Sequence, residues 1–414
     1  MINSPFSNPK FIETWSAHFN NSKLPIKFRF INNVSFIKSK YLPLYVNVGK
    51  NLTNGIFYKL ENDETDYKKK VFFLYDIPEY FKIQKQPSSF LKIKSIKQYN
   101  GYLLNIKEYL DTEDYFKKKF SSKSRWKIKR AKKRLESCLN IKYDVLYGPD
   151  TSKQQYDMVF DYFNKLLKKR EAEKKVNNHN LSTKKWNYLY DLVYPLILEK
   201  KAALFVIYND NIPISIYLNY ISDNVLFSAF PVFDNDYSKF NVGYVDNLKH
   251  VEWCFENNKD IFDFSKGDYK YKKRLANKEY KFEYHVLYDS KSLRSVILAK
   301  LIILYFYIKQ YFREKEYNIL FHKFLFFFKQ KNLKTNDGFE TPYIKSMGNE
   351  YDLTKIEFYD EQYSFLKRNV LDFLFKHSES LDSINIYKIN NEKQSYLIEG
   401  KKHIQKIIQR NKQL

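Results

Sequence analysis

The order of secondary-structure patterns between Asn140 and Tyr288 is the feature that most constrains how this chain folds. Alternating runs rich in β-branched and aromatic residues predict strands, and apolar residues spaced by three and four predict helices. The pattern predicts a strand, two helices, three strands, a helix, a strand, a short helix and a last strand, at residues 140–147, 154–175, 183–200, 202–208, 212–220, 225–230, from Gly243, 260–264, 269–276 and 282–288. Polar turns make the three central strands an antiparallel meander, which we expect Pro231 to close.

The sequence before this pattern predicts an α/β unit made mostly of strands, followed by a basic helix. Short aromatic strand patterns occur in residues 1–110, at 42–48, 71–75 and 102–106. From Lys117 to Arg134 there are eleven Lys or Arg and no acid. Within and just after this stretch, one apolar stripe at helical spacing is formed by Ile128, Ala131, Leu135 and Cys138. The serines before it, Ser121, Ser122 and Ser124, are candidate helix caps.

This order of elements resembles the GNAT, or acyl-CoA N-acyltransferase, topology. The segment FDFSKGDYKYKKRLA, residues 262–276, resembles the closing motif of the CelD-type, BioF-like acetyltransferases. Three further segments resemble that branch, namely SKSRWKIKRAKKRLE at 122–136, KLLKKREAEKK at 165–175 and SNPKFIETW at 7–15. The resemblance spans roughly residues 5–290. Its relatives include the Fem-type transferases built of two GNAT-like halves, which implies such a half at 1–110 and an acetyltransferase domain at 111–289.

The resemblance implies an N-acyltransferase that moves an acyl or acetyl group from acyl-CoA to an amine. It further implies an acceptor such as a nucleotide-linked or lipid-linked amino sugar of a cell-surface polysaccharide precursor. One alternative is a Fem-like transferase that uses aminoacyl-tRNA, with residues 117–134 contacting phosphates. Another is a non-enzymatic nucleic-acid-binding protein, suggested by the net charge of +25. Only ten of the 72 basic residues are Arg, which disfavours the reading of base edges.

Residues 234–243 occupy the place of the loop that seats the donor pyrophosphate in this fold. Backbone amides at a helix start attract phosphate, and Gly243 stands alone where a Gly-rich run is typical. The alternative for Gly243 is an ordinary helix start. The stretch that follows Gly267 is expected to place Lys272, Lys273 and Arg274 at the mouth of the sheet, where they would bind the phosphorylated donor. The alternative for this stretch is a solvated basic helix.

Two residues are predicted to act in catalysis. Asp263 would orient the amine or accept its proton, and Tyr271 would protonate the leaving thiolate. Four further residues are predicted to contact substrate, namely Arg130, Arg170, Gly267 and Asp268. Asp268 has a second interpretation as a helix cap, and both arginines have one as surface ion pairs.

The sequence gives no support to several other classes of protein. The isolated histidines and the two cysteines, Cys138 and Cys254, match no zinc spacing, so no metal is expected. Neither a Gly-x-Ser-x-Gly elbow nor a GxxxxGK loop is present, which disfavours a serine hydrolase and a P-loop NTPase. The first residues lack the pattern of a signal peptide, so we expect a cytoplasmic protein.

Residues 290–331 form a basic and apolar segment. Its longest apolar run, 296–308, contains Lys300 as its one charge and is shorter than the ~20 residues of a membrane span, so no transmembrane helix is expected. Nine Lys or Arg against two Glu in 291–331 suggest a tether on the cytoplasmic face of an anionic membrane. The alternative is a helix buried against the catalytic domain.

Residues 332–414 predict a small α/β appendage with a helix at 362–375, a hairpin across Asn390 and Asn391, and a final helix.

Overall fold

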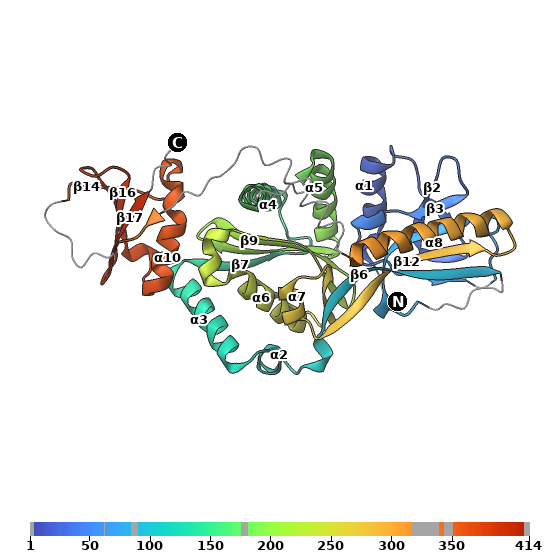
Figure 1. Ribbon diagram of the computed structural model, residues 1–414, viewed down its shortest axis with the longest axis horizontal. Helices are drawn as coiled ribbons and strands as arrows, with labels where there is room; N and C mark the ends of the chain where they lie inside the picture. The colour runs from blue at the N-terminus through green and yellow to red at the C-terminus, as the bar shows by residue number, and fades with distance from the viewer. Residues whose placement is uncertain are drawn as a thin grey trace.

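A computed structural model describes residues 4–61, 63–83, 90–174, 181–315, 339–342 and 351–409. In these residues a 12-stranded mixed sheet runs through the first and central parts of the chain, and a five-stranded sheet forms the C-terminal appendage. The appendage and the first part lie at opposite ends of the molecule (Figure 1).

The central part of the chain has the predicted order of elements. Its helices and strands are β7 (Ile141–Leu146), α4 (Lys153–Lys174), α5 (Thr183–Leu198), β8 (Ala202–Asn209), β9 (Ile212–Ile221), β10 (Val225–Phe233), α6 (Val242–Glu256), β11 (Ile261–Lys266), α7 (Lys270–Leu275) and β12 (Lys278–Asp289). Strands β7 to β10 pair antiparallel, and β10 pairs parallel with β11. Helices α4 and α5 cover one face of the sheet, and α6 and α7 lie on the other (Figure 1). The predicted α/β order is therefore confirmed.

The sheet opens between β10 and β11. These two strands pair only from Val225 to Phe227 on β10. Beyond that point β10 has a bulge between Ser228 and Phe230 and continues along β9, while β11 continues along β6. The expectation that Pro231 closes the meander is wrong, because β10 extends to Phe233. A proline fits there because this part of β10 has left β11 and is an edge.

The first part of the chain supplies the rest of the large sheet. Its elements are α1 (Pro9–Phe19), β1 (Ile26–Phe28), β2 (Ile31–Lys38), β3 (Leu44–Asn47), β4 (Lys59–Leu60), β5 (Val71–Pro78) and β6 (Leu91–Asn105). Strand β12 lies between β5 and β6 and pairs antiparallel with both. The strand expected at 102–106 is the end of the longer β6, whose first half alternates with exposed lysines.

Two helices connect the first and central parts. They are α2 (Thr112–Lys119) and α3 (Ser122–Cys138). The predicted stripe of α3 is confirmed, because its four residues are the buried ones of that helix. The Ser121 side chain accepts a hydrogen bond from the Ser124 N–H group, which confirms the predicted cap.

The C-terminal appendage packs against α3 and against the loop before α6. Its elements are β13 (Phe339–Glu340), β14 (Leu353–Lys355), α10 (Lys367–His377), β15 (Asn385–Ile389), β16 (Ser395–Glu399) and β17 (Ile404–Gln409). The hairpin across Asn390 and Asn391 is confirmed. The final helix is wrong, because residues 404–409 form β17 and pair with β16. The isoleucines there sit at spacings that suit either structure, and a neighbouring strand decides between them.

Helix α8 (Leu293–Glu314) follows β12 and lies along the first part of the sheet (Figure 1). It packs on β12, β6 and β5 with Ser295, Ala299, Phe306 and Gln310 buried and exposes most of its other apolar side chains, so the alternative of a helix buried against the catalytic domain holds for one face only. Among the described residues, α8 is a helix long and apolar enough to cross a membrane by length and composition. The apolar run expected at 296–308 is the middle of this longer helix. Residues 316–331 of the predicted segment lie outside the described residues.

Candidate functional site

Two cavities lie on the two sides of the opening between β10 and β11. The first, here called the α6 pocket, has a volume of about 370 Å³, which is within the range of small-molecule sites. Its walls come from α4, β9, β10, α6, α7 and the loop before α6. The lining residues are Arg170, Ser215, Tyr217, Pro231, Phe233, Ser238, Asn241, Val242, Gly243, Tyr244, Asp246, Asn247, Tyr269, Tyr271 and Leu275.

The α6 pocket combines an aromatic wall with a helix start and one arginine. The N-cap residue of α6, Asn241, has φ +54° and makes no hydrogen bond from its side chain to the first turn. Gly243 lies close to the Phe233 ring, because an added Cβ would come within 3.1 Å of it. The Arg170 Nη1 atom donates a hydrogen bond to the Pro231 carbonyl oxygen at 2.9 Å. The positive end of α6 and a guanidinium thus line one cavity, an arrangement that attracts anions.

The loop before α6 is held from outside the pocket. Asp234 forms ion pairs with Lys169 of α4 at 2.5 Å and with Lys367 of the appendage at 2.9 Å. These two lysines lower the pKa of Asp234 against the opposing effect of burial. Asp234, the first residue of the segment expected to seat the pyrophosphate, therefore has its charge neutralised by these two lysines.

A buried acceptor atom in the α6 pocket has no partner among the described residues. The Asn247 side chain is 6% exposed, and its Nδ2 atom donates to the Gly243 carbonyl oxygen. Its Oδ1 atom is buried without a hydrogen bond. Because an unsatisfied buried acceptor is costly, an N–H group of a ligand would be stabilised there.

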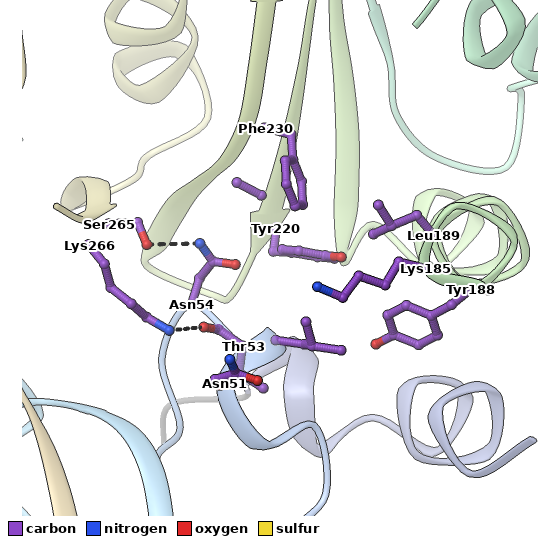
Figure 2. A pocket seen from close by; sticks show the side chains of 12 residues that line it. Asn51, Thr53, Asn54, Lys185, Tyr188, Leu189, Tyr220, Phe230, Ser265 and Lys266 are labelled. Carbon is purple, nitrogen blue, oxygen red and sulfur yellow. Dashed lines mark hydrogen bonds between the residues drawn. The ribbon is translucent and has the colours of Figure 1, made fainter. Parts of the chain in front are cut away.

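The second cavity, here called the α5 pocket, lies between α5 and the loop after β3 and has a volume of about 160 Å³ (Figure 2). Its lining residues are Asn51, Leu52, Thr53, Asn54, Lys185, Tyr188, Leu189, Tyr220, Ala229, Phe230, Ser265 and Lys266. In Figure 2 the Lys185 side chain extends into the cavity. The Lys266 Nζ atom donates to the Thr53 carbonyl oxygen at 2.8 Å and pairs with Asp76 at 2.6 Å. Burial lowers the pKa of Lys266.

Hydrogen bonds connect the two pockets through the opening. Asn54 Nδ2 donates to Ser265 Oγ at 2.9 Å, as Figure 2 shows, and to the Ser228 carbonyl oxygen at 3.1 Å. The Ser228 hydroxyl is 2.9 Å from the Tyr217 hydroxyl, and the Tyr271 side chain lies close to Tyr217. Tyr217 and Tyr271 line the α6 pocket, while Asn54 and Ser265 line the α5 pocket. A chain of polar groups therefore crosses the sheet where its strands diverge.

Asp263 lies at the point of divergence and lines neither pocket. It is fully buried and accepts hydrogen bonds from the Tyr80 and Tyr280 hydroxyls at 2.6–2.7 Å and from the Ser265 N–H group at 2.7 Å. Burial raises the pKa of Asp263 to about 6, although these hydrogen bonds oppose the shift. The Tyr280 ring covers the Gly101 backbone so closely that a Cβ there would lie 2.3 Å from it.

The three predicted cations of α7 lie in three different environments. Lys272 is 5% exposed and donates to the Ser265 and Lys266 carbonyl oxygens at 3.3 and 2.5 Å. Burial lowers its pKa to about 8. Lys273 is exposed and pairs with Asp268 at 3.3 Å. Arg274 donates to the hydroxyl of Tyr244, a residue of the α6 pocket wall, at 3.1 Å. Of the three, Arg274 is the one placed against that wall.

Gly267 and Asp268 form the turn between β11 and α7. Gly267 has φ +103°, a conformation that favours glycine. Asp268 accepts hydrogen bonds from Tyr102 and from Asn100, and the Tyr102 hydroxyl lowers its pKa. The N-cap of α7 is Tyr269, so the cap interpretation of Asp268 is wrong.

The remaining predicted residues divide between two places. Tyr271 and Arg170 line the α6 pocket, and burial raises the pKa of Tyr271 to about 12. Arg130 lies on α3 with its guanidinium 5.0 Å from the Trp126 ring. Together with Arg134 it lines a separate cavity of about 440 Å³ between α3 and α10. That cavity also contains the cations Lys239 and Lys376 and the acid Asp372.

The sequence analysis did not single out Asn54, Lys185, Ala229 or Asn247, which are four of the residues that line the two pockets. Asn247 could have been recognised from the sequence, because it is a polar residue beside the buried stripe of its helix. Lys185 and Asn54 could not, since one resembles any lysine of a helix and the other any asparagine of a loop. Among the described residues, no group of three or more His, Cys, Asp or Glu side chains is placed to hold a metal ion.

The comparison with protein families gives a match in the central part of the chain. Residues 122–273 match the model of the family described as acetyltransferase (GNAT) domain. The matched stretch begins at α3 and ends within α7, so it contains the opening and most of both pockets. This confirms the mixed α/β GNAT fold, while the CelD-type branch stays a prediction. A comparison with curated proteins gives no match.

A comparison with solved structures gives several matches at low identity. FemX is 11% identical with a TM-score of 0.45 and covers 68% of this chain and 91% of its own. A conserved protein of unknown function from Bacteroides thetaiotaomicron is 10% identical with a TM-score of 0.44, covering 69% of this chain and 92% of its own. A tandem GNAT protein from the clavulanic acid biosynthesis pathway is 6% identical with a TM-score of 0.31, covering 61% and 77%.

Proposed function

We propose that this chain, whose central part is a GNAT acetyltransferase domain, is an N-acyltransferase with acyl-CoA as donor and a primary amine as acceptor. The donor binds in the α6 pocket and the amine in the α5 pocket. The observation that carries the proposal is the opening between β10 and β11, which joins the two pockets through hydrogen-bonded polar groups.

The α6 pocket suits the parts of a CoA thioester. The first turn of α6 and Arg170 attract the pyrophosphate, since both present positive charge to the cavity. The unpaired Asn247 Oδ1 atom accepts an N–H group of the pantetheine amides. The aromatic wall packs against the pantetheine chain.

The transfer forms a C–N bond and breaks a C–S bond at the thioester carbonyl. The amine attacks as the free base, and the sulfur leaves with a proton from Tyr271. Because the pKa of Tyr271 is raised to about 12, its phenol is protonated at neutral pH and can give that proton. Tyr271 regains a proton from the new amide nitrogen through Tyr217 and Ser228. The backbone N–H group at the Ala229 bulge is our candidate for stabilising the carbonyl oxygen.

The α5 pocket favours an acceptor that also carries an anionic group. Lys185 and Lys266 lie on its two sides, and Lys266 already pairs with Asp76. Lys185 is therefore the cation placed to contact the phosphate of a nucleotide-linked or lipid-linked amino sugar. The cavity itself is small, so it would hold the amine and its nearest groups.

Calorimetry with acetyl-CoA and an assay of thiol release with phosphorylated amino sugars test the proposal. Arg170→Ala should weaken acetyl-CoA binding about 10- to 100-fold, because a charge-assisted hydrogen bond contributes about 1.5–3 kcal/mol. The matched control is Arg29→Ala, an exposed arginine paired with Glu64 in the first part of the chain. Unchanged binding in Arg170→Ala, or an equal loss in the control, would contradict the donor site.

A second candidate donor is aminoacyl-tRNA. The cavity lined by Arg130, Arg134, Lys239 and Lys376 favours it, because these cations meet beside the basic helix α3. Binding of labelled tRNA and of acetyl-CoA to the same preparation separates the two donors. Steeply salt-dependent tRNA binding without acetyl-CoA binding would replace the first proposal. Product formation from either donor would exclude a non-enzymatic nucleic-acid-binding protein.

A further inference from the structure

Helix α8 presents to solvent an apolar face that Lys300 interrupts. Leu301, Leu304 and Tyr305 are 60%, 57% and 60% exposed, and the other members of the face are at least 44% exposed. These members recur at helical spacing along about five turns of the helix, namely Leu293, Ile297, Leu301, Leu304, Tyr305, Tyr307, Ile308 and Tyr311. Such a large exposed apolar patch marks an interaction surface.

The opposite face of α8 is fixed to the sheet, so the helix cannot turn its apolar face inward. The Phe306 ring packs 4.5 Å from the rings of both Phe73 and Tyr284. At the C-terminal end, Arg313 donates to the Gln98 carbonyl oxygen and lies 4.0 Å from the Tyr99 ring. The first turn is capped by a side chain, since Ser292 accepts a hydrogen bond from the Ser295 N–H group.

The charges around the apolar face are almost all positive. Five exposed cations belong to the helix or to its ends, namely Lys291, Arg294, Lys300, Lys309 and Lys315. The acid of the helix, Glu314, is paired with Lys97 of β6 at 2.9 Å. An apolar stripe that contains tyrosines and is flanked by lysines is the pattern of a helix at an anionic lipid surface.

We propose that α8 docks this protein on an anionic lipid bilayer, with the face defined above inserted at the level of the headgroups. The helix lies in the plane of the membrane and does not cross it, because its other face is held by the sheet. Tyrosine hydroxyls and lysine side chains then reach the aqueous side while the aliphatic groups enter the acyl boundary. The inference does not depend on acyl transfer.

Flotation of the full chain with lipid vesicles tests the proposal. The wild type should float with phosphatidylcholine vesicles that contain phosphatidylglycerol, and high salt should reduce this binding. The variant Leu301→Gln, Leu304→Gln, Ile308→Gln keeps residues that favour helix and should lower the bound fraction at least about tenfold. The matched control is Leu24→Gln, Leu42→Gln, Leu110→Gln, which removes three exposed leucines that do not belong to α8 and should float like the wild type.

A fluorescent label reports which face touches the lipid. Both native cysteines are buried, so an environment-sensitive thiol probe would label an added exposed cysteine selectively. The emission of the probe on Leu304→Cys should shift to the blue with anionic vesicles. The probe on Leu110→Cys should show no shift.

Four results would overturn the proposal. The first is no flotation at low salt, and the second is equal flotation of the α8 variant and the wild type. The third is a dimer that the α8 variant abolishes, which would make a second copy of the chain the occupant of the face. The fourth is shielding of the Leu304→Cys probe from an aqueous quencher in a monomer without vesicles, which would make residues 316–338 the occupant.

Discussion

The two pockets on the two sides of the open sheet differ in size, lining and charge. The α6 pocket is the larger, has five aromatic residues in its lining and joins a helix start to Arg170. The α5 pocket is smaller and more polar, and it holds two lysines, Lys185 and Lys266. One sheet thus has a larger, more apolar pocket with an anion seat on one face and a smaller cationic cavity on the other. The difference assigns the long donor to the first pocket and the anionic acceptor to the second.

The separation of the pockets depends on the residues between them. Asp263 holds the divergence point through Tyr80 and Tyr280, and Lys272 covers the last carbonyl groups of β11. Neither side chain lines a pocket. This arrangement makes Asp263 a determinant of stability and of the shape of the opening, which a pH titration can separate from a role as catalytic base.

The largest expected effect is on the pH dependence of stability at Asp263. Burial raises its pKa from 3.8 to about 6, so the folded state keeps this proton to a higher pH than the unfolded state. The free energy of unfolding should therefore fall as the pH rises from about 4 to about 6, by up to ~3 kcal/mol from this group. Asp263→Asn should lack this fall, and denaturant unfolding of both proteins across the range measures it.

Asp263→Asn also changes the free energy of unfolding by an amount that does not depend on pH. This amount does not affect the test, because the test compares only how the free energy of unfolding of each protein changes with pH. A difference between the two proteins that stays the same from about pH 4 to pH 7 would mean that the Asp263 carboxylate is ionised throughout. The divergence point would then be held by a charged group. Asp263 would be reconsidered as a base for the amine in the α5 pocket.

The next largest effect is expected from filling each pocket in turn. Gly243→Leu places a larger side chain beside Phe233 in the α6 pocket. Ala229→Leu places a larger side chain in the α5 pocket. We expect kcat/KM for acyl-CoA to fall about 100-fold in Gly243→Leu, because two phosphate contacts are lost. In Ala229→Leu the KM of the amine should rise and the Kd of acetyl-CoA should change little. If Gly243→Leu raised the KM of the amine and Ala229→Leu weakened acetyl-CoA binding, the donor and acceptor pockets would have to be exchanged.

The smallest expected effect is on the charge of the acceptor. Lys185→Glu should raise the KM of a phosphorylated amine about tenfold and leave the KM of an uncharged amine within about twofold. The matched control is Lys184→Glu, whose side chain is exposed beside Phe19 instead of facing the pocket. Steady-state kinetics with paired acceptors measures the effect. An equal rise in the KM of both amines would contradict the proposal that the acceptor carries an anionic group.

The fold of the central part was predictable because its elements depend on local patterns. The stripe of α3, the cap at Ser121 and the meander turns each involve residues close in sequence. The errors occurred where a distant partner decides. Pro231 is tolerated in β10 because β11 has moved away, and residues 404–409 are a strand because β16 lies beside them.

The candidate site was predictable in part, and α7 shows why. Lys272, Lys273 and Arg274 are adjacent basic residues, and successive residues of a helix point about 100° apart. One therefore turns under the sheet, one faces solvent and one reaches the α6 pocket wall. The sequence does not reveal which face of so short a helix is covered. Asn54 and Lys185 join the site only through the packing of distant segments.

The position of β12 between β5 and β6 has a consequence for synthesis of the protein. Residues 278–289 must fill a gap between strands made of residues 71–78 and 91–105. At about 5–20 residues per second, the ribosome takes on the order of ten seconds or more to make the intervening chain. Throughout that interval the nascent β5 and β6 have open edges toward each other. Newly made chains thus offer chaperones a defined period of binding, which ends when β12 is released.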